Sequence, residues 1–279
     1  MAAGKTPAAR KAPAAKRKAP WVSLGAFFCA LLLAAAAAAA DCVLGEADEL
    51  VALKRVQDGD TLLLEDGRRV RLIGVNTPEL AREGRPAEPL AREAKHFTER
   101  FLADGGLELV YDRERRDSYG RLLAHVYNHR GDNLESALLA AGLAFHVAMA
   151  PNLSLAECLS EREAWARSDR RGLWAPGVWP VKRAADVRPG DGGFVVLRGR
   201  VRKADHNRYL WLELDGPVAL RLDPQGDFGQ LGRRDWQGAQ IEVKGWLLDR
   251  GSKYTSQFPQ NKRWFIAVDS PYTLKISKN

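Results

Sequence analysis

Oxygen-bearing groups that suit a hard divalent cation stand close together in the first third of the chain. Asp60 offers a carboxylate, Asn76 an amide oxygen and Thr77 its backbone carbonyl. Oxygen ligands of this kind are preferred by Ca²⁺ and Mg²⁺ rather than by zinc. These three residues are therefore candidate metal ligands, with Asp58 in a supporting position. The plainer interpretation is that Asp58 and Asp60 stabilise a bulge at Gly59.

Two arginines and a glutamate in the same half of the chain have the chemistry to act on a phosphate. Arg71 and Arg121 can bind phosphate oxygens by charged hydrogen bonds and stabilise charge that develops there. Glu79 can orient a water molecule or remove its proton. With a cation, these groups are equipped to hydrolyse a phosphodiester. Tyr119 is expected to pack behind Arg121, where it can also touch a ligand.

Each of these residues also has a purely structural interpretation. Arg71 can lie on a solvated strand face, and Glu79 can be an exposed loop acid. Arg121 can form an ion pair with Asp117. Any one of these interpretations is reasonable by itself, but their joint occurrence favours a site.

The elements that must position these groups follow from the hydrophobic pattern. Alternation predicts strands at 50–56, 62–64, 70–75, 107–111 and 121–127. Helical spacing predicts helices at 90–103, 132–142 and 154–168. Ser154 and Glu157 predict a capping box at the start of the last helix. This order of elements predicts an OB-fold, a five-stranded barrel with helices attached, whose rim can gather strand ends from distant parts of the chain.

A second barrel is expected after a linker. Prolines and glycines mark residues 177–192 as the linker between a domain at 41–176 and a domain at 193–279. Five β-rich runs in the second domain, at 194–201, 209–214, 218–222, 241–248 and 264–268, predict a small OB-like β-barrel. The chain is therefore expected to be mainly β with helices.

The formal charge of +8 is unevenly distributed along the 279 residues. Residues 1–40 contribute +6, residues 41–180 contribute −5 and residues 181–279 contribute +7. The basic final part interleaves aromatic residues, a combination that binds single-stranded nucleic acid in OB-folds. The alternative is that the aromatic residues form the core and the charges are solvated.

Residues 1–40 are predicted to be an export signal. A basic stretch precedes the uncharged residues 21–40, which end in small residues suited to cleavage after Ala40. The alternative is a retained membrane anchor, because twenty helical residues cover about 30 Å. The protein is therefore expected in the periplasm or outside the cell, or anchored through residues 21–40.

The three cysteines are too few for a disulfide-dense scaffold, and no paired CxxC motif indicates structural zinc. After export only Cys42 and Cys158 would remain, in an oxidising compartment. They can form a disulfide that ties the mature N-terminus to a helix. Alternatively, Cys158 is buried and free, and Cys42 lies in a frayed end.

Three motifs in this order resemble those of the staphylococcal nuclease (thermonuclease) family: VQDGDT, RLIGVNTPE and DSYGRLLAHVY. The resemblance covers roughly residues 50–175, including the helices and the closing GLW at 172–174. It implies a calcium-dependent endonuclease of DNA and RNA on an OB-fold that leaves 3′-phosphate ends.

The family resemblance also implies roles for individual residues. Asp60 and Thr77 match calcium ligands, the latter through its carbonyl, and Glu79 matches the proposed general base. Arg71 and Arg121 match the phosphate-binding arginines.

Two departures from the family pattern stand out. Asn76 occupies a position where the family has a metal-binding aspartate, so weaker Ca²⁺ binding or another metal preference is expected. The loop at 148–151 lacks the tyrosines that pack on the nucleotide and has Met149 and Ala150 instead.

The sequence therefore predicts an exported, metal-dependent endonuclease that acts on DNA, RNA or both, with the basic second domain as a tether. Ca²⁺ is the expected cofactor, another divalent cation is the alternative, and no organic cofactor is indicated. A second hypothesis is a non-catalytic module that binds nucleic acid or protein. A third is a surface-attached structural protein, and only a retained leader would bring membrane contact. The sequence leaves the oligomeric state open.

Overall fold

The computed structural model describes residues 1–2, 42–82, 84–206, 208–223, 228, 234–251 and 262–277. The chain divides into two units, Met1–Ala40 and Asp41–Asn279. The predicted export signal at 1–40 lies outside the described residues, apart from its first two. No helix in the described part of the chain is long and apolar enough to cross a membrane.

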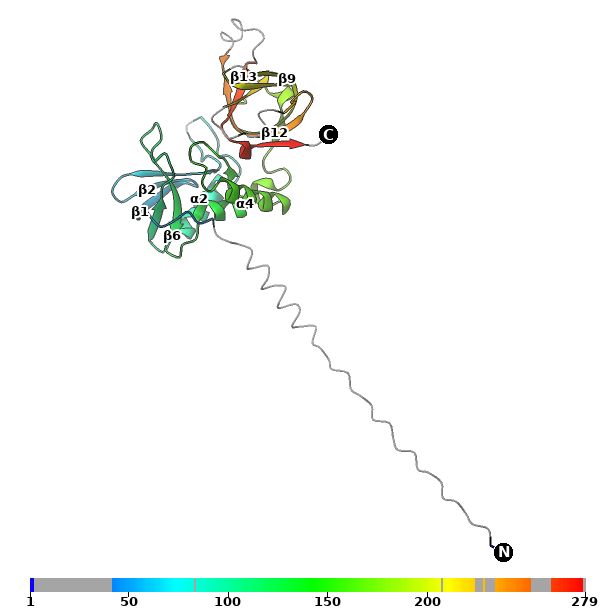
Figure 1. Ribbon diagram of the computed structural model, residues 1–279. Helices are drawn as coiled ribbons and strands as arrows, with labels where there is room; N and C mark the ends of the chain where they lie inside the picture. The colour runs from blue at the N-terminus through cyan, green and yellow to red at the C-terminus, as the bar shows by residue number, and fades with distance from the viewer. Residues whose placement is uncertain are drawn as a thin grey trace. The chain divides into compact units, whose positions relative to one another are not determined.

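The first barrel is closed by five strands in the order β1-β2-β3-β6-β5 (Figure 1). These are β1 (Glu49–Asp58), β2 (Thr61–Leu64), β3 (Arg69–Leu72), β5 (Gly106–Val110) and β6 (Leu122–Asn128). All neighbours are antiparallel except β3 and β6. Alternate strand residues fill its interior, among them Leu62, Leu64, Val70, Leu72, Leu107, Leu109, Ala124 and Val126. The predicted five-stranded barrel is confirmed.

Three described helices accompany this barrel: α2 (Ala91–Phe101), α3 (Leu134–Ala140) and α4 (Ala156–Ser168). The side chain of Asn133 caps α3 by accepting a hydrogen bond from the Ser136 amide at 2.7 Å. The capping box predicted for α4 is wrong. Leu155 is the N-cap, and Ser154 donates to the carboxylate of Asp112 through both its amide and its hydroxyl. Ser154 therefore bonds the carboxylate of Asp112, which is distant in the sequence, instead of capping the helix that follows it.

The strand predicted at 70–75 is interrupted. β3 ends at Leu72, and a separate short strand β4 (Val75–Asn76) pairs with β7 (Phe145–His146), which the sequence did not indicate. Gly74 makes the break with a φ of 80°. Its carbonyl accepts hydrogen bonds from the Val147 amide at 3.0 Å and from the His146 ring at 2.8 Å. Asn76 is thereby placed opposite Phe145.

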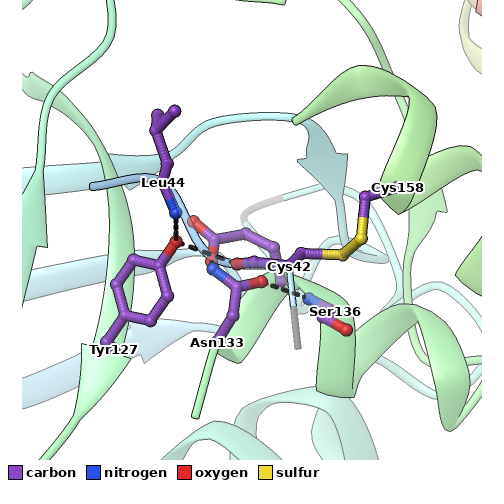
Figure 2. Close-up of a disulfide and its surroundings, with 7 residues drawn as sticks. Cys42, Leu44, Tyr127, Asn133, Ser136 and Cys158 are labelled. Atoms are coloured by element: carbon purple, nitrogen blue, oxygen red, sulfur yellow. Dashed lines mark hydrogen bonds between the residues drawn. A yellow bond between two sulfur atoms is a disulfide. The ribbon is translucent and has the colours of Figure 1, made fainter. Parts of the chain in front are cut away.

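A disulfide joins Cys42 to Cys158 on α4 (Figure 2). Next to it, the Tyr127 hydroxyl donates to the Cys42 carbonyl at 2.9 Å and accepts from the Leu44 amide at 3.0 Å. The start of the second unit is thus held by one covalent bond and two hydrogen bonds. Of the two states considered for these cysteines, the structure has the paired one.

The second barrel is also closed by five strands, since β12 pairs with both β9 and β13. These are β9 (Gly193–His206), β10 (Leu210–Leu214), β11 (Val218–Leu222), β12 (Gln240–Asp249) and β13 (Trp264–Val268). Large residues fill its core, including Leu197, Leu212, Leu220, Trp236, Val243, Trp264 and Ile266. The predicted OB-like barrel is confirmed, and part of its aromatic content is core.

Short elements surround the two barrels. η1 (Gly172–Trp174) closes the first, β8 (Val181–Arg183) and η2 (Ala184–Asp186) lie in the predicted linker, and η4 (Pro271–Thr273) precedes β14 (Leu274–Ser277). β8 and β14 extend the sheet of the second barrel at its ends. The division of the chain into domains at 41–176 and 193–279 stays a prediction.

Helix α4 contacts strand β12 through buried charges. The Lys244 ammonium pairs with the Glu163 carboxylate, and their side chains are 3% and 2% exposed. Glu242, two residues earlier on β12, accepts from Arg167 at 2.8 Å and from Arg198 at 2.8 Å. Burial raises the pKa of Glu242, but hydrogen bonds from these two arginines outweigh it and lower the pKa to about 2.

Reduction of the disulfide is expected to destabilise the second unit. Replacing Cys42 and Cys158 by serine should lower the free energy of unfolding by up to about 5 kcal/mol, because the bridge closes a loop of 116 residues in the unfolded chain. Urea titrations of the wild type with and without reductant should show the same loss, and the double-serine variant should not respond to reductant. A wild-type midpoint that does not move under reductant would contradict this prediction.

Candidate active site

A cavity of about 640 Å³ at the rim of the first barrel gathers most of the predicted site residues. Its lining includes Asp60, Arg71, Asn76, Glu79, Tyr119 and Arg121. They come from the turn between β1 and β2, from β3, from β4, from the loop after β4 and from the loop before β6. Of these predicted residues, the two that are farthest apart in the sequence, Asp60 and Arg121, therefore line the same cavity.

Asp60 is the buried acid at the base of this arrangement. Its carboxylate accepts from the Thr77 amide at 2.7 Å and from the Thr61 hydroxyl at 3.2 Å, and it lies 3.2 Å from Arg71 Nη2. Its side chain is only 8% exposed. Thr77 does not line the cavity, and the group it presents to Asp60 is its N–H rather than its carbonyl.

Gly59 allows the turn that carries Asp60 to approach Thr77. A Cβ atom on Gly59 would lie 2.7 Å from Thr77 Cγ2. The Gly59 carbonyl accepts a hydrogen bond from the buried hydroxyl of Thr98 on α2 at 2.8 Å. The helix and the missing side chain together determine where the Asp60 carboxylate lies.

Asp58 and Asp60 form a close pair of acids. The Asp60 amide donates to Asp58 Oδ1 at 3.2 Å. Burial, followed by the negative charge of Asp60, raises the pKa of Asp58 to about 6. A cation would relieve this repulsion, and the nearby donors are hard oxygens: two carboxylates and the Asn76 amide. The residues therefore fit Ca²⁺ or Mg²⁺, although no group of three or more His, Cys, Asp or Glu side chains suits a metal within the described residues.

Arg71 is fixed in the cavity wall from several sides. Its Nη1 donates to the carbonyls of Leu72 at 2.9 Å and Val75 at 2.8 Å, and its Nη2 donates to Asn76 Oδ1 at 3.2 Å. With the contact to Asp60, the guanidinium bridges the acid and the amide. Arg71 therefore does not lie on a solvated strand face, which was the alternative interpretation of this residue.

Arg121 is held more loosely. Its Nε donates to Asp117 Oδ2 at 2.6 Å, and its guanidinium carbon lies 5.7 Å from the centre of the Tyr119 ring. The ion pair with Asp117 is thus real, and Arg121 also lines the cavity. Its two Nη groups make no hydrogen bond to any described residue, so they can meet an anion.

Glu79 lines the cavity from the loop after β4 but is paired with Arg82. Arg82 Nη2 donates to Glu79 Oε2 at 2.7 Å, and both side chains are more than half exposed. The Glu79 amide donates to Glu88 Oε2 at 2.8 Å, which orders the loop. Because the pair with Arg82 is exposed, it is weak and can open at little cost.

Several lining residues were not found from the sequence. Arg82 looks like any loop arginine, and Val147 carries no polar chemistry. Trp246 comes from β12 of the second barrel, whereas every other lining residue lies between Asp58 and Asn152. No local pattern signals such a contact, since it depends on how β12 meets the first barrel.

Comparison with known proteins identifies relatives of the first barrel. A family model described as "Staphylococcal nuclease homologue" matches residues 69–176. Thermonuclease of Staphylococcus intermedius is 38% identical over 126 residues, which are 44% of this chain and 74% of the relative. Thermonuclease of Staphylococcus hyicus is 34% identical over 124 residues, with shares of 43% and 73%. Endonuclease YncB of Bacillus subtilis is 34% identical over 139 residues, with shares of 48% and 65%.

The close approach at Gly59 yields a test of how Asp60 is positioned. Gly59→Ala is expected to destabilise the fold by about 1–3 kcal/mol and to displace Asp60, because the new methyl group overlaps Thr77. Gly106→Ala in β5 is the matched control, since a Cβ there meets nothing within 4 Å. Chemical denaturation measures the free energy of unfolding of the two variants. Equal stability of the two variants would show that the approach to Thr77 is not tight.

Proposed function

Since the chain belongs to the staphylococcal nuclease family and is a phosphodiester hydrolase, we propose that it is a divalent-cation-dependent endonuclease of DNA, RNA or both. One observation carries the proposal: Asp60, Arg71, Glu79 and Arg121 line one cavity. These four residues supply two guanidinium groups, a buried acid and an exposed acid, which are groups that phosphodiester hydrolysis needs.

The two arginines would bind the scissile phosphate. Arg71 is held by backbone carbonyls, so it offers a positive charge whose position is set before substrate arrives. Arg121, with its Nη groups directed at no described residue, would donate to the phosphate oxygens. Both charges would act most strongly as negative charge builds on phosphorus-bound oxygens in the transition state.

Glu79 would act as the general base. On substrate binding its carboxylate would exchange Arg82 for a water molecule and accept a proton from it. The water oxygen would then form a bond to phosphorus while the bond to the leaving oxygen breaks. Arg82, once released, would remain near the cavity as a further positive charge.

A divalent cation would be held by Asp60 and Asn76, with Asp58 close by. When bound, it would supply Lewis-acid stabilisation of charge on the phosphate. Ca²⁺ is the cation we propose. Asn76 offers an oxygen without a negative charge, so affinity for Ca²⁺ should be modest, and another divalent cation can serve.

Export is part of the proposal. The disulfide between Cys42 and Cys158 supports it, because such bonds persist in oxidising compartments. Residues 1–40 would direct the chain to the periplasm or out of the cell, or residues 21–40 would anchor it in a membrane.

Catalysis is tested with the chain from Asp41 and a defined oligonucleotide. Glu79→Gln and Arg121→Ala should each lower kcat by about 100-fold or more, because they remove the base and a phosphate donor. Arg130→Ala is the matched control, since Arg130 is an exposed arginine paired with Asp104 and does not line the cavity.

The metal role is read in the same assay. Cleavage should stop in chelator and return with Ca²⁺, and Asn76→Asp should lower the Ca²⁺ concentration needed. Full activity in chelator would refute the metal role. Inactivity of both the wild type and Asn76→Asp with every divalent cation tried would favour the non-catalytic binding module.

Export predicts a mature protein that begins at Asp41. N-terminal sequencing of the protein recovered from its producing cell, outside the cytoplasm, checks this. A mature chain that still begins at Met1 and sediments with membranes would favour the anchor instead.

A further inference from the structure

The aromatic residue Trp246 stands at the edge of the candidate active site although it belongs to the second barrel. It lies on β12 and lines the cavity that holds Arg71 and Arg121. This residue is 38% exposed. An exposed tryptophan beside a phosphate-binding cavity is a candidate ligand contact.

Buried charges set the position of Trp246. Side chains two residues apart on a strand point to the same face, so Glu242, Lys244 and Trp246 share one face of β12. Glu242 pairs with Arg167 and Lys244 pairs with Glu163, both on α4. Trp246 lies on the same face of β12 and lines the cavity.

Glu163, which pairs with Lys244 on β12, also contacts the short sheet that contains Asn76. Glu163 Oε1 accepts a hydrogen bond from the His146 amide of β7 at 2.8 Å. β7 pairs with β4, where Phe145 lies opposite Asn76. One glutamate thus contacts both β12 and the short sheet at the base of the cavity.

Trp246 also packs against aromatic residues. The rings of Trp246 and Phe194 are 5.2 Å apart and nearly perpendicular, and Phe194 packs on Phe145 at 5.0 Å. Met149, which is 53% exposed, lines the cavity on the side of the first barrel. Tyr119, Met149 and Trp246 are the large exposed side chains that line the cavity, and Trp246 is the one that comes from the second barrel.

We propose that Trp246 stacks on an unpaired base of the nucleic acid whose phosphate lies at Arg71 and Arg121. The second barrel thereby completes the substrate site of the first. Bases in a duplex have both faces covered by their neighbours, so only an unpaired base can offer a face to the indole. Trp246 therefore adds affinity only for single-stranded or locally unpaired substrates. This inference rests on the proposed function and deepens it.

The test measures binding separately from cleavage. The full chain carrying Glu79→Gln is titrated, in Ca²⁺, into a fluorescent single-stranded oligonucleotide, and anisotropy gives the Kd. Adding Trp246→Ala should weaken binding about 10- to 100-fold, as expected for loss of one stacked base. Trp246→Phe should retain most of the affinity.

Three controls define the mechanism. Trp165→Ala removes a tryptophan on α4 that is 46% exposed and does not line the cavity, and it should leave the Kd unchanged. An oligonucleotide with abasic sites should bind the parent and Trp246→Ala equally. A duplex of the same sequence should also bind both equally.

Equal affinity of the parent and Trp246→Ala for the single strand would overturn the inference. So would an equal loss on the abasic strand, because the indole would then act without a base. If the wild type fails to cleave while the Trp246 effect is present, the catalytic proposal fails and the stacking contact stands. If the wild type cleaves the oligonucleotide but Trp246→Ala does not change the Kd, the catalytic proposal stands and the stacking contact fails.

Discussion

The buried carboxylate of Asp60 organises the first barrel's rim, because a buried negative charge is stable only where donors or cations surround it. Three groups surround the Asp60 carboxylate: the amide of Thr77, the hydroxyl of Thr61 and the guanidinium of Arg71. Satisfying one charge therefore brings the turn between β1 and β2, strand β3 and the end of β4 together. Arg71 is left bridging acid and amide at the cavity wall, where the proposed function requires a phosphate-binding group.

A second set of buried charges joins the two barrels at α4 and β12. Removing one partner of the Lys244–Glu163 pair would leave the other buried and uncompensated, which is strongly unfavourable. Apolar packing tolerates sliding more readily than paired charges do. The charges on β12 pair with residues of α4, and Trp246 on the same face of β12 lines the cavity.

Much of the fold and part of the site could be predicted from sequence. Period-two alternation marks the strands of both barrels, and Asp60, Asn76, Arg71 and Arg121 are recognisable by type and order. The failures have particular causes. Ser154 bonds Asp112 instead of capping α4, and Gly74 breaks a strand so that β4 can pair with β7. In each case a distant partner outcompeted the local one.

The sequence by itself determined the chemical inventory of the site and the fold class: hard oxygens, two arginines, one glutamate and two barrel-forming patterns. Those properties are local, since side-chain type and hydrophobic period can be read along a few residues. Only the tertiary structure decided that Thr77 meets Asp60, that Glu79 is paired with Arg82, and that Trp246 joins a cavity built more than 90 residues earlier. Such contacts depend on barrel closure and on the burial of charges, and neither leaves a signature in the residues that flank them.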